Sequence, residues 1–215
     1  MGSLSIPEKL LGEVVASRER IQSTVKRVAK EIYYSVDYVG LKPIFLCLRE
    51  GAVPFHRDLT NELQKLSFPF ESGWLKTHHH YAGTEGSGQV QLFPYEGPPL
   101  KNRLVVIVED IIDSSETIIR VCEFLDQQGV SQRNICTLLF KERPENIGWR
   151  NTGLNGYEHL PEVRHVGLFI EPLFVVGYGL DYNQYGRDGE EVRTLTIQGQ
   201  AWVDEQLHKH APALG

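Results

Sequence analysis

Cysteine is scarce in this sequence. Three cysteines stand among 215 residues, an odd number without the paired spacing of a disulfide framework. Cys47 and Cys136 lie in apolar runs typical of strands, and Cys122 lies in a segment typical of a helix. Buried, reduced thiols that pack in the core are therefore the favoured interpretation, ahead of a catalytic cysteine. The same scarcity favours an intracellular protein, and we expect it to be cytoplasmic.

The sequence also lacks an excess of positive charge and any long apolar stretch. Its 22 Lys and Arg are outnumbered by 28 Asp and Glu, so the formal net charge is −6. Nucleic-acid binding depends on clustered Lys and Arg, and we expect no nucleic-acid partner. The apolar runs are far shorter than a membrane span and no signal-peptide core is found, so we expect no membrane association. The length suits one α/β domain over residues 1–215.

The segment from Leu104 to Thr117 is the most informative part of the chain. It reads LVVIVEDIIDSSET and opens with five apolar residues that predict a strand buried on both faces of a parallel sheet. Three carboxylates follow at Glu109, Asp110 and Asp113, ahead of small hydroxyl residues that suit the start of a helix. Open α/β sheets bind ligands at the carboxyl ends of their strands. The segment therefore predicts a ligand site.

Strand-like and helix-like segments alternate along the chain. We expect helices over residues 7–36, 53–66 and 115–128, and strands over 44–48, 68–75, 104–108, 135–140, 174–178 and 192–197. The polar, glycine-rich stretch 77–99 is expected to be a functional or mobile loop, and 142–172 to be irregular. This order predicts an α/β fold with a mostly parallel twisted sheet flanked by helices.

Polar residues stand where four of the expected strands end. They are Arg49, the Glu109–Asp110 pair, Lys141 and the turn 177–181. If the sheet is parallel, these ends lie together at one edge.

These segments resemble a known family. VIVEDIIDSSET is similar to the phosphoribosyl-pyrophosphate motif of type I phosphoribosyltransferases. LLFKERPENIGW and FVVGYGLDYNQYGRD resemble the hypoxanthine-guanine phosphoribosyltransferases, and the likeness runs in order from about Ile44 to Ile197. The resemblance implies the type I fold, with a small hood from the C-terminal part and a mobile lid at about 77–99. It also implies Mg²⁺-dependent transfer of a phosphoribosyl group from phosphoribosyl pyrophosphate to hypoxanthine or guanine, giving IMP or GMP and pyrophosphate in purine salvage.

The resemblance also implies a role for each motif. Asp113 is implied to be the catalytic residue, as general base or proton acceptor beside N7 of the base. The residues implied to bind the phosphoribosyl group and its phosphate are Glu109, Asp110, Ser114, Ser115, Glu116 and Thr117. Those implied to bind pyrophosphate are Arg49, Glu50, Gly51 and Arg187, with a non-proline cis bond expected at Leu48–Arg49. Those implied for the base are Lys141, Phe174, Val175 and Asp181; for the lid, His80 and Tyr81; and for Mg²⁺, Glu109, Asp110 and Asp181.

The sequence departs from the family pattern in several places. Glu50 and Ser115 stand where glycine is usual, and Glu116 stands where a small, neutral or basic residue is common. The stretch between Lys141 and Phe174 is longer than the family pattern, and it bears on the base pocket or on an oligomer interface. The first three departures fall on the phosphate and pyrophosphate loops, so they bear on substrate affinity and identity.

Simpler interpretations compete for several residues. The three carboxylates can be a solvated strand end with a helix cap. Lys141 can be a surface residue that ends a strand, and Phe174 can be a core residue. Asp181 and Arg187 can form a surface ion pair of small energetic weight.

Two other functions compete with purine salvage. One is a related phosphoribosyltransferase that acts on a different heterocyclic base. The other is a non-catalytic, nucleotide-binding regulator with the same fold. The family also implies a homodimer or homotetramer.

Overall fold

The computed structural model describes residues 4–80, 89–113, 116–143 and 163–210. The chain divides into two compact units, which are described separately. The sheet unit comprises residues 23–172, and the terminal unit comprises residues 1–22 and 173–215.

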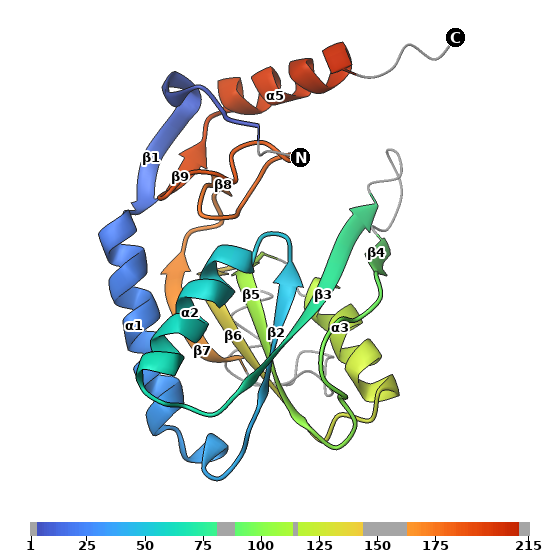
Figure 1. Cartoon of the computed structure of the whole chain (residues 1–215). Helices are drawn as coiled ribbons and strands as arrows, with labels where there is room; N and C mark the ends of the chain where they lie inside the picture. The colour runs from blue at the N-terminus through green and yellow to red at the C-terminus, as the bar shows by residue number, and fades with distance from the viewer. Residues whose placement is uncertain (1–3, 81–88, 114–115, 144–162, 211–215) are drawn as a thin grey trace. The chain divides into compact units, whose positions relative to one another are not determined.

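The sheet unit contains a six-stranded sheet in the order β4-β3-β2-β5-β6-β7 (Figure 1). All neighbouring pairs are parallel except β3 and β4. The strands are β2 (Ile44–Arg49), β3 (Glu71–His80), β4 (Gln89–Leu92), β5 (Leu104–Ile112), β6 (Gln132–Lys141) and β7 (Val163–Ile170). The expected mostly parallel sheet is confirmed. The carboxyl ends of β2, β5 and β6 therefore lie side by side, as parallel register requires.

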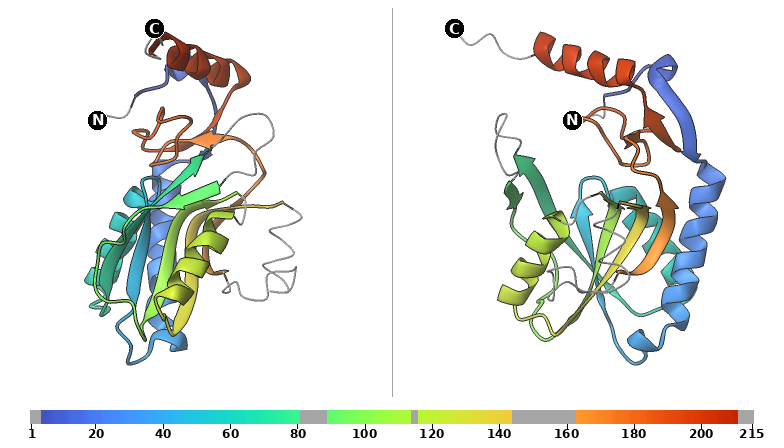
Figure 2. Two further views of the ribbon diagram at one scale, coloured as in Figure 1. Left: turned by 90° about the vertical axis from the view of Figure 1, so that its right-hand side faces the viewer. Right: turned by 180° about the vertical axis from the view of Figure 1, so that it is seen from behind.

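Helices cover both faces of this sheet. Helix α2 (Val53–Lys65) and helix α3 (Glu116–Gln127) lie on opposite faces (Figures 1 and 2). On the α3 face, Ile118, Val121 and Leu125 pack against alternate residues of β2 and β5, including Leu46 and Ile107. Burial of both sheet faces explains why the strand segments are continuous apolar runs.

The terminal unit has a smaller sheet of three antiparallel strands in the order β1-β9-β8. Its elements are the 3₁₀ helix η1 (Glu8–Leu10), β1 (Leu11–Ala16), β8 (Val175–Val176), β9 (Val192–Leu195) and α5 (Ile197–His210). Its core is formed by Ile6, Val176, Tyr185, Leu195 and Val203. The turn 177–181, expected at the edge of the parallel sheet, instead follows β8 of this second sheet. That expectation was wrong because β8 pairs with β9 and not with a strand of the sheet unit.

The expected helix over residues 7–36 was wrong at its start. Residues 8–16 form η1 and β1, and α1 runs from Arg18 to Tyr34, followed by the 3₁₀ helix η2 (Val36–Tyr38). The spacing of the apolar residues before Ser17 fits a helix or a strand. Pairing of β1 with β9 stabilises the strand. Ser17 Oγ accepts a hydrogen bond from Arg20 N at 3.3 Å, which fixes the start of α1.

Several expected loops were regular structure. Part of the stretch 77–99 forms the end of β3 and all of β4, which pair as a hairpin. Part of the stretch 142–172 forms β7, which pairs in parallel with β6. The polar tail contains α5. In each case the residue pattern alone only weakly indicates a helix or strand, and pairing or packing with distant residues stabilises it.

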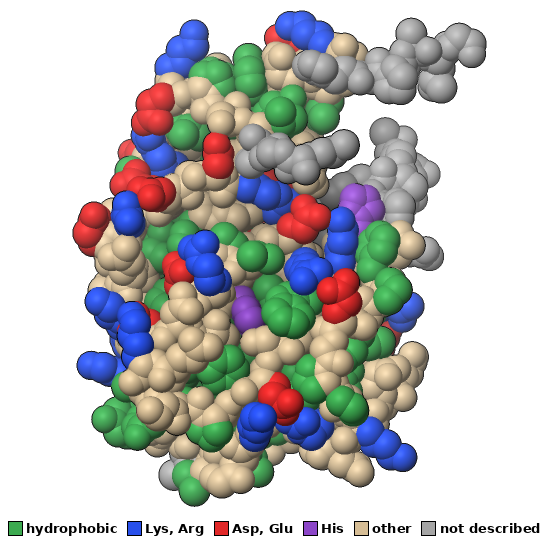
Figure 3. Space-filling model, in the orientation of Figure 1, with side chains coloured by type: hydrophobic (Ala, Val, Ile, Leu, Met, Phe, Trp, Pro, Cys, Tyr) green, Lys and Arg blue, Asp and Glu red, His purple; other side chains and the backbone are tan. Residues whose placement is uncertain are grey.

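The thiols agree with the interpretation drawn from the amino-acid composition. All three cysteines are free and buried, as expected, and burial raises the pKa of the Cys47 and Cys122 thiols to about 12. On the face drawn in Figure 3, Lys and Arg side chains are mixed with Asp and Glu. Within the described ranges, no helix is long and apolar enough to cross a membrane.

Candidate functional site

Two adjacent carboxylates lie on β5 near its carboxyl end. The strand runs past its expected end at residue 108 to Ile112, so Glu109 and Asp110 belong to the strand itself. Each is only 8% exposed. Burial, and then the Asp110 carboxylate, raise the pKa of Glu109 well above its usual range. Two buried acids this close favour a cation or hydroxyl ligand that relieves their repulsion.

Hydrogen bonds orient this pair but leave one oxygen open. Ile111 N donates to Asp110 Oδ1 at 2.8 Å, and Asp110 N donates to Glu109 Oε1 at 3.3 Å. Glu109 Oε2 is buried, and no hydrogen-bond partner lies near it among the described residues. A buried carboxylate oxygen without a protein partner is a candidate contact for a ligand.

Gly51 packs directly on Asp110. A Cβ atom at Gly51 would lie 1.9 Å from Asp110 Oδ2, a distance that only glycine avoids. The turn after β2 and the carboxylates of β5 therefore form one continuous surface, as the sequence predicted for these strand ends.

Asp113 and Lys141 meet across the ends of β5 and β6. Lys141 Nζ donates to Asp113 Oδ2 at 2.5 Å, and Arg143 Nη2 lies 2.7 Å from Asp113 Oδ1 as an ion pair. The Lys141 side chain is 4% exposed, whereas that of Asp113 is 43% exposed. Lys141 is thus a buried cation held by a half-exposed acid, and the interpretation of Lys141 as a surface residue was wrong.

The loop after β2 carries its own ion pairs. Arg49 Nη1 lies 3.2 Å from Glu96 Oε2, and its guanidinium lies 5.5 Å from the Trp74 ring centre. Lys76 Nζ donates to Glu50 Oε1 at 2.8 Å. Arg49 and Lys76 are therefore both engaged with acids of the same unit.

A non-proline cis peptide bond joins Arg49 to Glu50. It was expected one residue earlier, at Leu48–Arg49, and that position was wrong. Because β2 stays in regular parallel register with β3 through Arg49 and Lys76, the bond falls after the last paired residue.

In the terminal unit, a tight loop holds Asp181 and Arg187 together. Arg187 Nη2 lies 2.8 Å from Asp181 Oδ1, and Arg187 Nη1 donates to Gly179 O at 2.7 Å. Gln184 N donates to Asp181 Oδ2 at 2.6 Å. The two side chains are only 22% and 20% exposed, so this pair is more enclosed than a surface ion pair. Gly177, with φ +100°, allows the turn because a Cβ there would lie 1.9 Å from a backbone oxygen.

Phe174 and Val175 precede this loop. Phe174 is 42% exposed and meets Tyr182 edge to face, with ring centres 5.0 Å apart. Val175 is buried and pairs with Thr194 in the ladder of β8 and β9. Phe174 is thus not a core residue, contrary to the simpler interpretation.

Some predicted site residues have less structural description. Ser114, Ser115 and Tyr81 lie outside the described residues, and His80 is the last residue of β3. Glu116 is exposed at the first position of α3, followed by the partly buried Thr117. An acidic residue is tolerated there because the helix dipole favours negative charge at its N-terminus.

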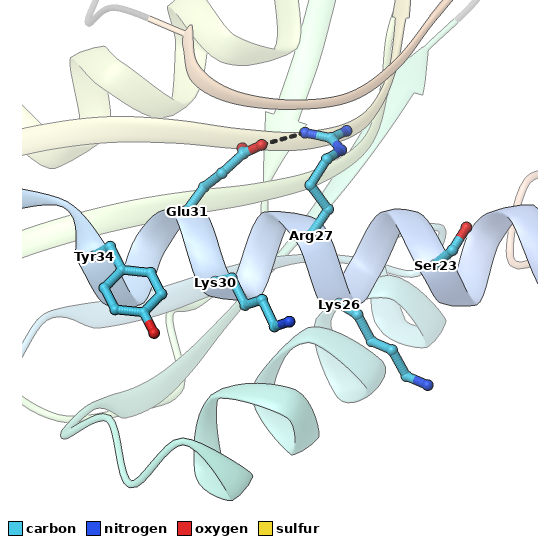
Figure 4. Close-up of a pocket in the computed structure, with 6 residues that line it drawn as sticks. All are labelled: Ser23, Lys26, Arg27, Lys30, Glu31 and Tyr34. Carbon is cyan, nitrogen blue, oxygen red and sulfur yellow. Dashed lines mark hydrogen bonds and ion pairs between the residues drawn. The ribbon is translucent and has the colours of Figure 1, made fainter.

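A hollow of about 610 Å³ lies elsewhere, along one face of α1 (Figure 4). It is lined by Ser23, Lys26, Arg27, Lys30, Glu31 and Tyr34, none of which is a predicted site residue. Arg27 pairs with Glu31 at 2.5 Å within it and also donates to the carbonyl of Gly167. Since one helix supplies the whole lining, this hollow is an open groove, and it contains none of the side chains of the candidate site.

Sequence reasoning missed Arg143, Lys76 and Glu96. Arg143 had no local signal, because β6 ends at Lys141 and a tight turn, in which Arg143 N donates to Lys141 O at 2.9 Å, brings its side chain to Asp113. The pairing of Lys76 with Glu50 depends on the β2–β3 register and had no local signal.

Comparison with known proteins gives consistent matches. The profile of the phosphoribosyl transferase domain matches residues 15–151. The hypoxanthine-guanine phosphoribosyltransferase of Staphylococcus aureus is 29% identical over 187 residues, covering 86% of this chain and 94% of that protein. The crystal structure of a hypoxanthine phosphoribosyltransferase from S. aureus has a TM-score of 0.72 at 28% identity, covering 88% of this chain and 94% of that one. The L. donovani hypoxanthine-guanine enzyme has a TM-score of 0.73 at 24% identity, covering 88% and 99%.

Proposed function

The chain belongs to the phosphoribosyltransferase family and has its type I fold, and on this premise we propose that it converts a 6-oxopurine into a nucleoside monophosphate. A nitrogen of hypoxanthine or guanine attacks C1 of phosphoribosyl pyrophosphate. The C1–N bond forms, and the C1–O bond to pyrophosphate breaks. The similar proteins of S. aureus are named a hypoxanthine-guanine and a hypoxanthine phosphoribosyltransferase, which supports a role in purine salvage.

The contact of Lys141 with Asp113, beside the acids of β5, is the observation that carries this proposal. Lys141 is a hydrogen-bond donor without acceptor capacity, so it suits the O6 carbonyl of a 6-oxopurine and not the amino group of adenine. Asp113 takes the proton that leaves the attacking base. A hydrogen-bond donor and a proton acceptor this close to each other suit one edge of the base, which supports the proposal.

The remaining sheet-unit groups support the sugar and its phosphates. Glu109 and Asp110 hold the ribose hydroxyls, and their negative charge stabilises the positive charge that develops at C1. The N-terminus of α3 receives the 5′-phosphate. The loop from Arg49 to Gly51 takes pyrophosphate.

For the terminal unit, the proposal keeps the roles that the family implies. Phe174 stacks on the purine, and the Val175 backbone bonds it. Arg187 contacts pyrophosphate, and Asp181 contributes to the metal site beside it.

Mg²⁺ fits the β5 carboxylates on chemical grounds. It prefers hard oxygen ligands, and Glu109 Oε2 is a buried oxygen without a hydrogen-bond partner among the described residues. We propose that Glu109 and Asp110 hold the ribose directly or through Mg²⁺. When bound, the ion would neutralise charge on the leaving pyrophosphate.

Pyrophosphate release tests the proposal. Purified protein is mixed with phosphoribosyl pyrophosphate, Mg²⁺ and, separately, hypoxanthine, guanine, xanthine and adenine. Release with a 6-oxopurine, little release with adenine, and loss of release on chelation are expected. No release with any of the four contradicts the proposal.

One observation favours a second function, nucleotide binding without turnover. The Glu50 carboxylate binds Lys76 in the loop assigned to pyrophosphate. A negative charge at that position repels the pyrophosphate leaving group. Calorimetric binding of IMP or GMP without turnover on any base would establish this function instead.

A further inference from the structure

The Asp113 carboxylate is held by two cations at once. Lys141 Nζ reaches Oδ2 at 2.5 Å, and Arg143 Nη2 reaches Oδ1 at 2.7 Å. The two cations engage different oxygens, so neither displaces the other. The Arg143 contact is an ion pair without the alignment of a hydrogen bond.

A tight turn at the end of β6 brings both cations to this acid. Arg143 N donates to Lys141 O at 2.9 Å, and Glu142 N donates to Ile170 O at 2.9 Å. The second bond continues the pairing of β6 with β7 for one residue past Lys141. The backbone therefore fixes Lys141 and Arg143 on one side, facing Asp113.

The two cations differ in burial, which suggests different tasks. The Lys141 side chain is 4% exposed, and the Arg143 side chain is 38% exposed. When Lys141 gives its proton donor to a base, its contact with Asp113 Oδ2 is lost. Arg143 offsets that loss, because it stays on the other oxygen.

We propose that Arg143 is a positioning residue that keeps Asp113 in place while Lys141 turns to the oxygen of the base. This role rests on the proposed function of the site. Without Arg143, Asp113 binds Lys141 more strongly and competes with the base for it. The affinity for the base then falls, while that for phosphoribosyl pyrophosphate does not.

Substitution of Arg143 by Gln or Met removes the charge at a partly exposed position. For both variants, the KM for hypoxanthine is expected to rise about 10-fold, the effect of one charged contact discounted for partial exposure. The KM for phosphoribosyl pyrophosphate should stay within about 2-fold, because the lost contact lies on the base side. Arg143→Lys restores a cation and should recover most of the loss. A general structural defect would move both KM values and would not be rescued by Lys.

A matched control is available in the same unit. Arg164 is 37% exposed and pairs with Asp37 at 3.1 Å. Arg164→Gln removes a similar ion pair near the amino end of β7, away from the carboxyl ends of the strands, and should leave both KM values unchanged. Thermal unfolding of every variant shows whether it folds. If Arg143→Gln does not fold, the KM values of Arg143→Met are used in its place.

The outcomes separate the two proposals. Absence of turnover by the wild-type protein with all four bases overturns the proposed function, and the role of Arg143 with it. Wild-type turnover together with an unchanged KM for hypoxanthine in the neutral variants overturns the role of Arg143 alone. Equal increases in both KM values, or no rescue by Lys, also overturn it.

Discussion

Stability should fall in mild acid because one histidine is buried in its neutral form. His165, on β7, is 6% exposed, and its Nε2 lies 3.0 Å from the Tyr38 hydroxyl. Asn134 Nδ2 donates to the same hydroxyl at 3.1 Å, which leaves the Tyr38 O–H free to donate to the neutral ring. Burial is the main cause that lowers the pKa of His165 from 6.5 to about 4. A protonated ring could no longer accept this hydrogen bond.

The direction of the pH effect follows from this lowered pKa. Between pH 6.5 and about 4 the unfolded chain binds a proton at His165 that the folded protein does not. The contribution of His165 is therefore complete above pH 6.5 and is lost as the pH falls toward 4. A difference of about 2.5 pH units corresponds to about 3 kcal/mol in total, of which about 2 kcal/mol is lost by pH 5. Glu31 and Asp37 oppose this shift, and Arg164 adds to it.

Urea unfolding of wild type and His165→Gln at pH 8 and pH 5 measures this contribution. Groups other than His165 titrate alike in both proteins, so the difference between the two isolates it. The stability of wild type relative to the variant should fall by about 2 kcal/mol from pH 8 to pH 5, or about 1 M in urea midpoint. His208→Gln, at an exposed position of α5, is the control and should follow wild type. The same difference between wild type and His165→Gln at both pH values would refute the reasoning.

Three further predictions concern the site. Asp113→Asn should lower kcat by about 10²–10⁴-fold while IMP still binds in calorimetry, and unchanged turnover would exclude Asp113 as the proton acceptor. Gly51→Ala should weaken phosphoribosyl pyrophosphate binding by about 10-fold, because its Cβ would lie 1.9 Å from Asp110 Oδ2 and force that carboxylate to turn. An unchanged KM would show that Asp110 moves without loss. Glu50→Gln should release Lys76 and tighten pyrophosphate binding by about 3-fold to 10-fold, and weaker inhibition by pyrophosphate would contradict this.

Much of the sheet unit was predictable because its signals are local. A run of buried, β-branched residues such as 104–108 has few alternatives to a central parallel strand. That assignment puts Glu109 and Asp113 near the carboxyl end of one strand, and the apolar run 135–140 likewise puts Lys141 at the end of the next. The helix start was misplaced near Ser17, where the spacing of apolar residues fits a helix or a strand equally well.

Local sequence patterns were therefore enough to predict the parallel sheet and the family, and they pointed to the acids and the lysine of the candidate site. Only the folded chain shows which charges meet: Lys141 and Arg143 contact the two oxygens of Asp113, and Glu50 contacts Lys76. It also shows that 142–172 contains a strand and that the turn after Val176 belongs to a second sheet. The reason is physical, since propensity and periodicity act over a few neighbouring residues. Register and ion pairing depend on residues that are far apart in the chain and are brought together only when it folds.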